Sequence, residues 1–206
     1  MLKPFLIILF FSLFTTGCSL NPENKLPQNK VEQKMASILD TEQSLSSDGK
    51  WTVFIRDIGD ERPSENFGEG YDSYNQIVIK NNDTNEERVI VNAEKIANLN
   101  IKNIDEFPID VLVGLSNPVF SLDGDRVFFN SVAWTTSLAT FYYDINTGNL
   151  SYLTHGSIKE TVKEGKNAGH LVLIKRKHIK NQPVMYCEFV INGDSGEVIE
   201  DLNICL

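Results

Sequence analysis

The sequence predicts an all-β domain that follows an N-terminal leader, and three observations support this prediction. The chain has 206 residues, 41% hydrophobic and 23% charged, which is typical of a globular protein. Short runs rich in Val, Ile, Phe and Tyr recur along residues 37–206, separated by Asp, Asn, Gly and Ser, as expected for strands joined by tight turns. An apolar stretch precedes them at the N-terminus.

Residues 1–17 are typical of a secretory signal peptide. Lys3 supplies the positive charge of such a leader, and small residues end the apolar run. From Phe5 to Phe14 the run covers about ten residues, too few for the ~20 of a membrane-spanning helix. The alternative is a buried N-terminal strand or helix, which the lack of polar residues in the run disfavours.

The end of this leader, Thr15-Thr16-Gly17-Cys18, resembles the lipobox of bacterial lipoproteins, with Thr15 where the family usually has Leu. The resemblance implies cleavage between Gly17 and Cys18, a diacylglyceryl group on the Cys18 thiol and an acyl chain on the new N-terminus. Several such chains together anchor a protein stably to a membrane. Ser19 after the cysteine resembles the pattern of lipoproteins sent to the outer membrane, where the host has two membranes. Residues 18–36 are polar with two prolines, and we expect a flexible tether.

The chain is acidic, with 19 Lys and Arg against 28 Asp and Glu and a formal charge of −9. Loss of residues 1–17 would remove only Lys3 and leave −10. Nucleic-acid binding calls for a basic surface, so this class of partner is disfavoured. Anionic lipid would repel such a surface, so the lipid on Cys18 is expected to hold the protein at the membrane.

The strand-like runs fall into three groups along the chain. They cover residues 50–56, 76–80 and 88–91, then 126–130, 139–143 and 150–154, and finally 170–174, 184–191 and 197–199. Helix is expected only as short segments near residues 31–39 and 93–99.

Turn sequences repeat between these groups. Ser47-Asp48-Gly49 precedes the first group, Ser121-Leu122-Asp123-Gly124 precedes the second, and Asp144-Ile145-Asn146-Thr147-Gly148 leads into Leu150-Ser151-Tyr152-Leu153-Thr154. These motifs resemble the TolB-type (WD40-like) β-propeller repeat. In that family Ser-x-Asp-Gly joins the first two strands of a blade and Asp-x-x-Thr-Gly joins the last two. The resemblance therefore implies about three four-stranded antiparallel propeller-like blades.

The spacing of the motifs agrees with this interpretation. Asp48 and Asp123 are 75 residues apart, and 37 once insertions of 18 and 20 residues at 57–74 and 93–112 are left out. A four-stranded blade takes ~40–45 residues. A closed ring needs four to eight blades, so we expect an open array or a twisted sandwich. A ring shared by two chains is the alternative, and a monomeric array is favoured.

No motif predicts catalysis or a cofactor. The three histidines, His155, His170 and His178, lack metal-ligand spacing, and both His155 and His178 are expected to be solvated. Asp144-x-Asn146-x-Gly148 resembles the start of a calcium loop, but the required glutamate is missing, which favours a simple turn. There is no Gly-x-Ser-x-Gly motif of a serine hydrolase.

The insertion at 57–74 is the most informative loop, since it places aromatic residues among acids and glycines, as recognition loops do. Its candidate contact residues are Phe67, Tyr71, Asp72 and Tyr74. The sequence thus favours a lipid-anchored binding or scaffold module of the bacterial cell envelope, contacting protein or glycan through loops without catalysis. The alternative is an envelope hydrolase that uses two carboxylates in a cleft between blades.

With Cys18 lipidated, Cys187 and Cys205 remain, and an even pair in an exported protein predicts a disulfide. A hairpin centred near Asp194 would place Cys187 opposite Asp201 or Leu202. Cys205 would then have to fold back to reach it. The alternative is two separate thiols.

Overall fold

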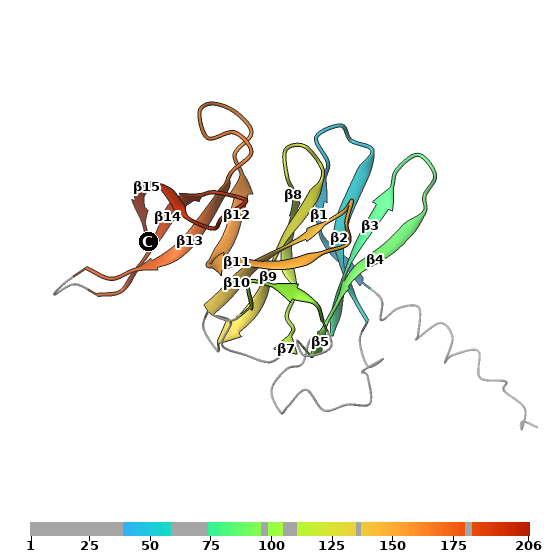
Figure 1. The fold of residues 1–206 in the computed structure, drawn as a ribbon, viewed down its shortest axis with the longest axis horizontal. Helices are drawn as coiled ribbons and strands as arrows, with labels where there is room; N and C mark the ends of the chain where they lie inside the picture. Colours follow the sequence, from blue (N-terminus) through green and yellow to red (C-terminus); the bar gives the residue numbers. More distant parts are fainter. Residues whose placement is uncertain (1–38, 59–73, 96–98, 105–110, 135–136, 180–182) are drawn as a thin grey trace, which may run out of the picture.

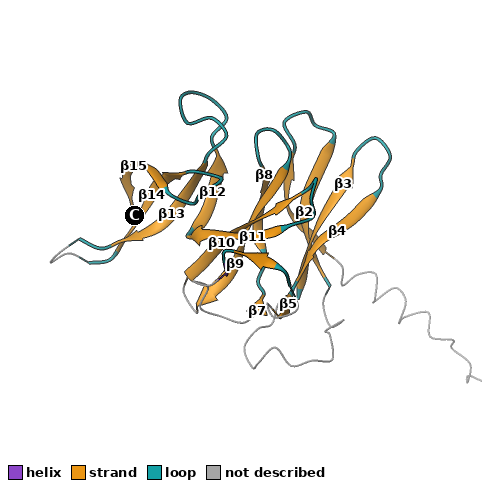
Figure 2. Ribbon diagram, in the orientation of Figure 1, coloured by secondary structure: helices purple, strands orange, loops and turns teal. Residues whose placement is uncertain are grey.

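The computed structural model describes residues 39–58, 74–95, 99–104, 111–134, 137–179 and 183–206. These residues form strands and turns without a helix, so the predicted all-β class is confirmed (Figure 2). The expectation of helix near residues 93–99 is wrong for Glu94–Lys95, which form strand β5. Within the described ranges, no helix is long and apolar enough to cross a membrane.

Three antiparallel sheets of four strands stand side by side along the array (Figure 1). The first blade comprises β1 (Leu39–Leu45), β2 (Trp51–Asp57), β3 (Asn75–Asn81) and β4 (Glu87–Asn92). The second comprises β8 (Ser116–Phe120), β9 (Arg126–Trp134), β10 (Ser137–Asp144) and β11 (Leu150–His155). The third comprises β12 (Ser157–Thr161), β13 (Leu171–Lys177), β14 (Met185–Ile191) and β15 (Val198–Cys205). The prediction of three blades is confirmed, and the segment before Asp48 supplies the first strand of the first blade.

The turn between the first two strands has the same hydrogen bonds in the first and second blades. The Ser46 hydroxyl donates to Asp48 at 2.7 Å, and the Ser121 hydroxyl donates to Asp123 at 2.5 Å. Each serine Oγ also accepts the backbone N–H that opens the next strand, at 3.0 Å in the first blade and 2.9 Å in the second. The repeated sequence motif therefore encodes a repeated local structure.

The turn between the last two strands is shared by all three blades. It begins with an Asn or Asp side chain that accepts backbone N–H groups two or three residues later, and it ends at a residue with positive φ. These end residues are Asn85 (φ 60°), Gly148 (φ 71°) and Gly196 (φ 75°). The sequence shows Thr-Gly at only one of these turns, so the first blade's version escaped detection.

The insertion at residues 93–112 adds strands that were not predicted. Strand β5 (Glu94–Lys95) pairs with β7 (Val111–Leu112) as a separate ribbon. Strand β6 (Ile101–Lys102) pairs in parallel with β11 and makes the second blade five-stranded.

The hydrophobic core lies in two layers on either side of the second blade. Phe129 packs in the layer shared with the first blade, where its ring stacks on Phe141 at 5.7 Å. Phe128 points the opposite way into the layer shared with the third blade. Neighbouring residues of a strand face opposite sides, so β9 alone joins both layers.

The array does not close into a ring. Strand β8, the first of the second blade, packs against both β1 and β12. In addition, Glu42 of β1 accepts the Asn117 backbone N–H of β8 at 2.5 Å. The sheets remain open rather than closing on one another, as the blade count predicts.

Candidate binding site at the junction of the second and third blades

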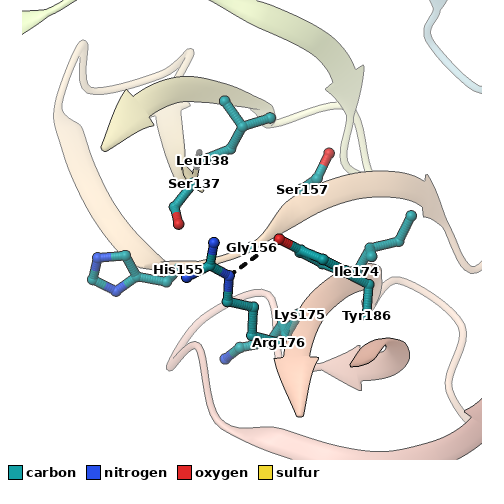
Figure 3. Close-up of a pocket in the computed structure, with 9 residues that line it drawn as sticks. All are labelled: Ser137, Leu138, His155, Gly156, Ser157, Ile174, Lys175, Arg176 and Tyr186. Carbon is teal, nitrogen blue, oxygen red and sulfur yellow. Dashed lines mark hydrogen bonds between the residues drawn. The ribbon is translucent and has the colours of Figure 1, made fainter. Parts of the chain in front are cut away.

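A cavity of about 560 Å³ lies where the chain passes from the second blade into the third. We call it the junction cavity. Strands β10, β11, β12, β13 and β14 contribute to its wall, which consists of Ser137, Leu138, His155, Gly156, Ser157, Ile174, Lys175, Arg176 and Tyr186 (Figure 3). The wall thus combines apolar side chains, hydroxyl groups and cations.

Gly156 makes the abrupt passage from β11 to β12 possible. Its φ of +142° is a conformation that side chains disfavour, and a Cβ there would lie 2.9 Å from Lys175 Cγ and 3.2 Å from the Ile174 carbonyl oxygen. Its N–H donates to the Leu138 carbonyl at 2.9 Å. A single residue without a side chain therefore lets β13 approach the end of β11.

The amide of Asn130, a fully buried residue of β9, holds the two blades together at this point. Its nitrogen donates to the Ala139 carbonyl (3.1 Å), the Thr140 hydroxyl (3.1 Å) and the Gly156 carbonyl (3.0 Å). Its oxygen accepts the Ile158 N–H of the third blade at 2.9 Å. Buried amides with all these partners fix geometry, so the junction is rigid.

Two cations of β13 border the junction cavity. The Lys175 ammonium donates to the Thr154 hydroxyl at 3.1 Å, and burial lowers the pKa of Lys175 below its ordinary value of 10.5. Arg176 donates through Nε to the Tyr186 hydroxyl at 3.2 Å, with its guanidinium 5.7 Å from the centre of that ring. Figure 3 shows the guanidinium reaching toward the middle of the cavity.

His155 completes this polar wall. Its Nδ1 shares a hydrogen bond of 2.7 Å with the Tyr152 hydroxyl, and the two rings meet edge to face at 5.6 Å. The expectation that His155 is solvated is therefore wrong, because it is half-buried against the core residue Tyr152.

The cations of two other hollows already have carboxylate partners. A hollow of about 660 Å³ beside β1, β8 and β12 contains Lys159, which pairs with Glu188 at 2.6 Å. A hollow of about 400 Å³ contains Arg126, which pairs with Asp194 at 2.5 Å. In contrast, no ion pair between described residues includes Lys175, and the described wall of the junction cavity contains no Asp or Glu.

The structure accounts for the predicted site residues in different ways. Gly17 and Cys18, and the loop residues Phe67, Tyr71 and Asp72, lie outside the described residues. Tyr74 is 5% exposed and packs with Ala93, Val111 and Val113. Its prediction as an exposed contact residue is wrong because it belongs to a small core beneath the loop.

Cys187 and Cys205 form the predicted disulfide, with their Cα atoms 4.1 Å apart. The predicted register is wrong, since the two cysteines are direct cross-strand partners and Asp201 pairs with Phe189 instead.

Other candidate groups have structural roles. Asp144 accepts the Thr147 N–H at 2.8 Å, which lowers the pKa of that carboxyl and identifies it as a turn residue. In the part of the chain that the structure describes, no cluster of three or more His, Cys, Asp or Glu could hold a metal ion. Each shifted carboxyl pKa among these residues is lowered, whereas a general acid needs a raised one. The described residues thus give the hydrolase alternative no support.

The residues of the junction cavity were missed because they come from five strands and share no motif. One sequence feature could have indicated them. Lys175-Arg176-Lys177-His178 is a basic run at the end of a strand in an otherwise acidic chain.

Comparison with known proteins bears on the fold alone. No protein-family model and no curated protein matches the sequence. Among solved structures, the β-propeller domain of the Trilobed protease from Pyrococcus furiosus is similar, with a TM-score of 0.50 and 14% identity over 80% of this chain and 42% of that one. Acylaminoacyl peptidase from Pyrococcus horikoshii has a TM-score of 0.50 and 13% identity over 82% and 26%. TolB from Acinetobacter baumannii has 0.48 and 14% over 81% and 33%.

The fold is propeller-like. The chain spans less than half the length of each of these structures, and its blades correspond to part of a propeller. The identities are too low to transfer an activity, since propellers host many functions.

Proposed function

We propose that the protein is a lipid-anchored binding module of the bacterial cell envelope that contacts a protein or glycan at the junction cavity. The observation that carries this proposal is the cavity itself, in which apolar side chains and cations meet on a rigid junction between two blades. Such pockets, mostly apolar with a few placed polar groups, are the usual form of a binding site.

The anchor in this proposal is the lipid on Cys18, supported by the lipobox-like residues before it. Where the host has two membranes, Ser19 favours the outer membrane. Metabolic labelling with an alkyne-bearing palmitate should label the full chain, and Cys18→Ala should abolish the label and release the protein from membranes. Equal labelling of the variant would contradict the anchor.

The binding role predicts that the junction faces its partner in the cell. A photo-crosslinking amino acid at Tyr186 should yield one specific adduct with an envelope component. The same amino acid at Val89, in the outer strand of the first blade, is the control, because both side chains are 41% exposed. Adducts of the same kind from both positions, or none from Tyr186, would overturn the role of the junction.

We also propose that the array acts as a monomer. The two end faces carry ion pairs, Arg56 with Glu87 at 2.9 Å on the first blade and Lys166 with Glu200 at 3.0 Å on the third. Strand alternation places these residues on the faces away from the second blade. Stacking a further blade on either face would bury charged groups at a cost in desolvation free energy.

A further inference from the structure

The junction cavity differs from its surroundings in charge. The protein has a formal charge of −9, yet the described wall of this cavity presents Lys175, Arg176 and His155 without an acid. A buried ammonium is stabilised best by an opposite charge, whereas Lys175 has only a neutral hydroxyl as its hydrogen-bond partner. The cavity is therefore electrostatically suited to an anion.

Its remaining wall indicates what accompanies the anion. Leu138 and Ile174 offer apolar surface, and Ser137 and Ser157 supply hydroxyl groups. Figure 3 shows Arg176 near the middle of the cavity with Tyr186 beside it. The planar guanidinium is held by the Tyr186 hydroxyl, and this geometry suits the flat fork of a carboxylate or the oxygens of a phosphate.

We propose that the junction cavity binds an organic anion that carries an apolar group, with Arg176 and Lys175 as its charge partners. A peptide that ends in an apolar residue has this chemistry through its terminal carboxylate, and so does an aryl phosphate. The inference rests on the proposed function for its biological setting, but it concerns the ligand that the cavity itself selects.

The test uses the full chain in detergent micelles with methyl NMR signals of Leu138 and Ile174 as local reporters. The probes are N-acetylphenylalanine, its amide and phenyl phosphate. The acid should shift both methyl signals, whereas the amide, which lacks only the charge, should bind at least tenfold more weakly. Phenyl phosphate shows whether a phosphate is accepted as well as a carboxylate.

Arg176→Gln should weaken binding of the anionic probes at least tenfold. Arg176 is exposed, so this variant is expected to remain folded. Arg88→Gln, which removes one exposed cation from the first blade, should change affinity less than twofold. Lys175→Met keeps the aliphatic stem and should also weaken anion binding.

Equal binding of acid and amide, or no shift with any probe, would overturn the inference. Equal loss in Arg176→Gln and Arg88→Gln would show a general charge effect and overturn it as well. The outcome separates from the proposed function. Probe binding without a cellular adduct at Tyr186 would leave the anion site and remove the envelope role, whereas an adduct without probe binding would do the reverse.

Discussion

Cys187 and Cys205 face each other directly across strands β14 and β15. From Phe189 to Cys187, β14 advances two positions, whereas β15 advances four from Asp201 to Cys205. Asn203 takes up the difference with a φ of 56°, and its N–H donates to the Asp201 carboxylate at 2.9 Å. This bulge brings the last cysteine into register, and the chain end pairs beyond it through the Leu206 N–H and the Tyr186 carbonyl at 2.9 Å.

Replacing both cysteines by serine should lower the free energy of unfolding by about 3 kcal/mol, because the bridge closes a loop that the unfolded chain would otherwise sample freely. Urea unfolding of the variant and of the wild type measures this difference. Hydrogen exchange at Leu206 should also become faster, since the chain end loses its covalent support. An unchanged unfolding midpoint, together with two alkylated cysteines in the non-reduced wild type, would contradict the bridge.

The sequence predicted those parts of the fold that depend on neighbouring residues. The Ser-x-Asp-Gly turns were found because each is closed by bonds within five residues, such as that of Trp51 N–H to Ser46. The third blade lacks this motif. It joins β12 and β13 through a longer connection in which the Gly169 N–H donates to the Val162 carbonyl at 2.8 Å. Hence its strands were predicted from composition and not from a repeat.

Contacts between distant segments could not be predicted in the same way. Tyr74 follows a polar loop, yet it packs beside Val113, 39 residues along the chain. Strand β6 has two residues and therefore no period to detect. The junction cavity joins Ser137 to Tyr186, and only the stacking of two blades brings them to one wall.

Asn130 should be essential for stability although it touches no proposed ligand. Asn130→Ala would leave the Ile158 N–H and the Gly156 carbonyl without this partner at the junction, and each such group costs about 1–3 kcal/mol. We expect a loss of about 3 kcal/mol in urea unfolding. The control is Asn149→Ala, because its side chain bonds only within its own turn to Thr147, and the expected loss is below about 1 kcal/mol. Equal losses in the two variants would show that Asn130 does not join the blades.

Two glycines with nearly the same backbone angle should respond differently to alanine. Gly49 has a φ of 71°, and a Cβ added to it would meet nothing within 4 Å, so Gly49→Ala should lose only the ~1–2 kcal/mol of a left-handed backbone. Gly196 has a φ of 75°, but its Cβ would lie 2.3 Å from the Leu153 carbonyl oxygen of the second blade. Gly196→Ala should therefore lose at least about 3 kcal/mol, since the third blade must move away. Thermal unfolding of the pair measures the difference, and similar losses would mean that the last turn does not contact the second blade this closely.

The turn carboxylates should make stability fall in acid. The Ser121 hydroxyl and the Asp125 N–H hold the pKa of Asp123 below its ordinary 3.8, and Ser46 does the same for Asp48. The folded state thus binds protons less readily than the unfolded state. Its added stability is complete above pH 3.8 and is lost as the pH falls below 3.8 through the lowered pKa.

Ser121→Ala removes the main cause of the lowered pKa of Asp123, so it should flatten the decline of stability below pH 3.8. At neutral pH the variant should lose about 1 kcal/mol, because solvent screens this partly exposed hydrogen bond. Urea unfolding at a series of pH values gives both quantities. Ser47→Ala is the matched control, since the Ser47 hydroxyl donates to the Leu122 carbonyl and to no carboxylate, and its pH profile should remain that of the wild type. If both variants keep the wild-type profile, the Ser121 hydroxyl does not set the pKa of Asp123, and the acid sensitivity must come from other carboxyl groups.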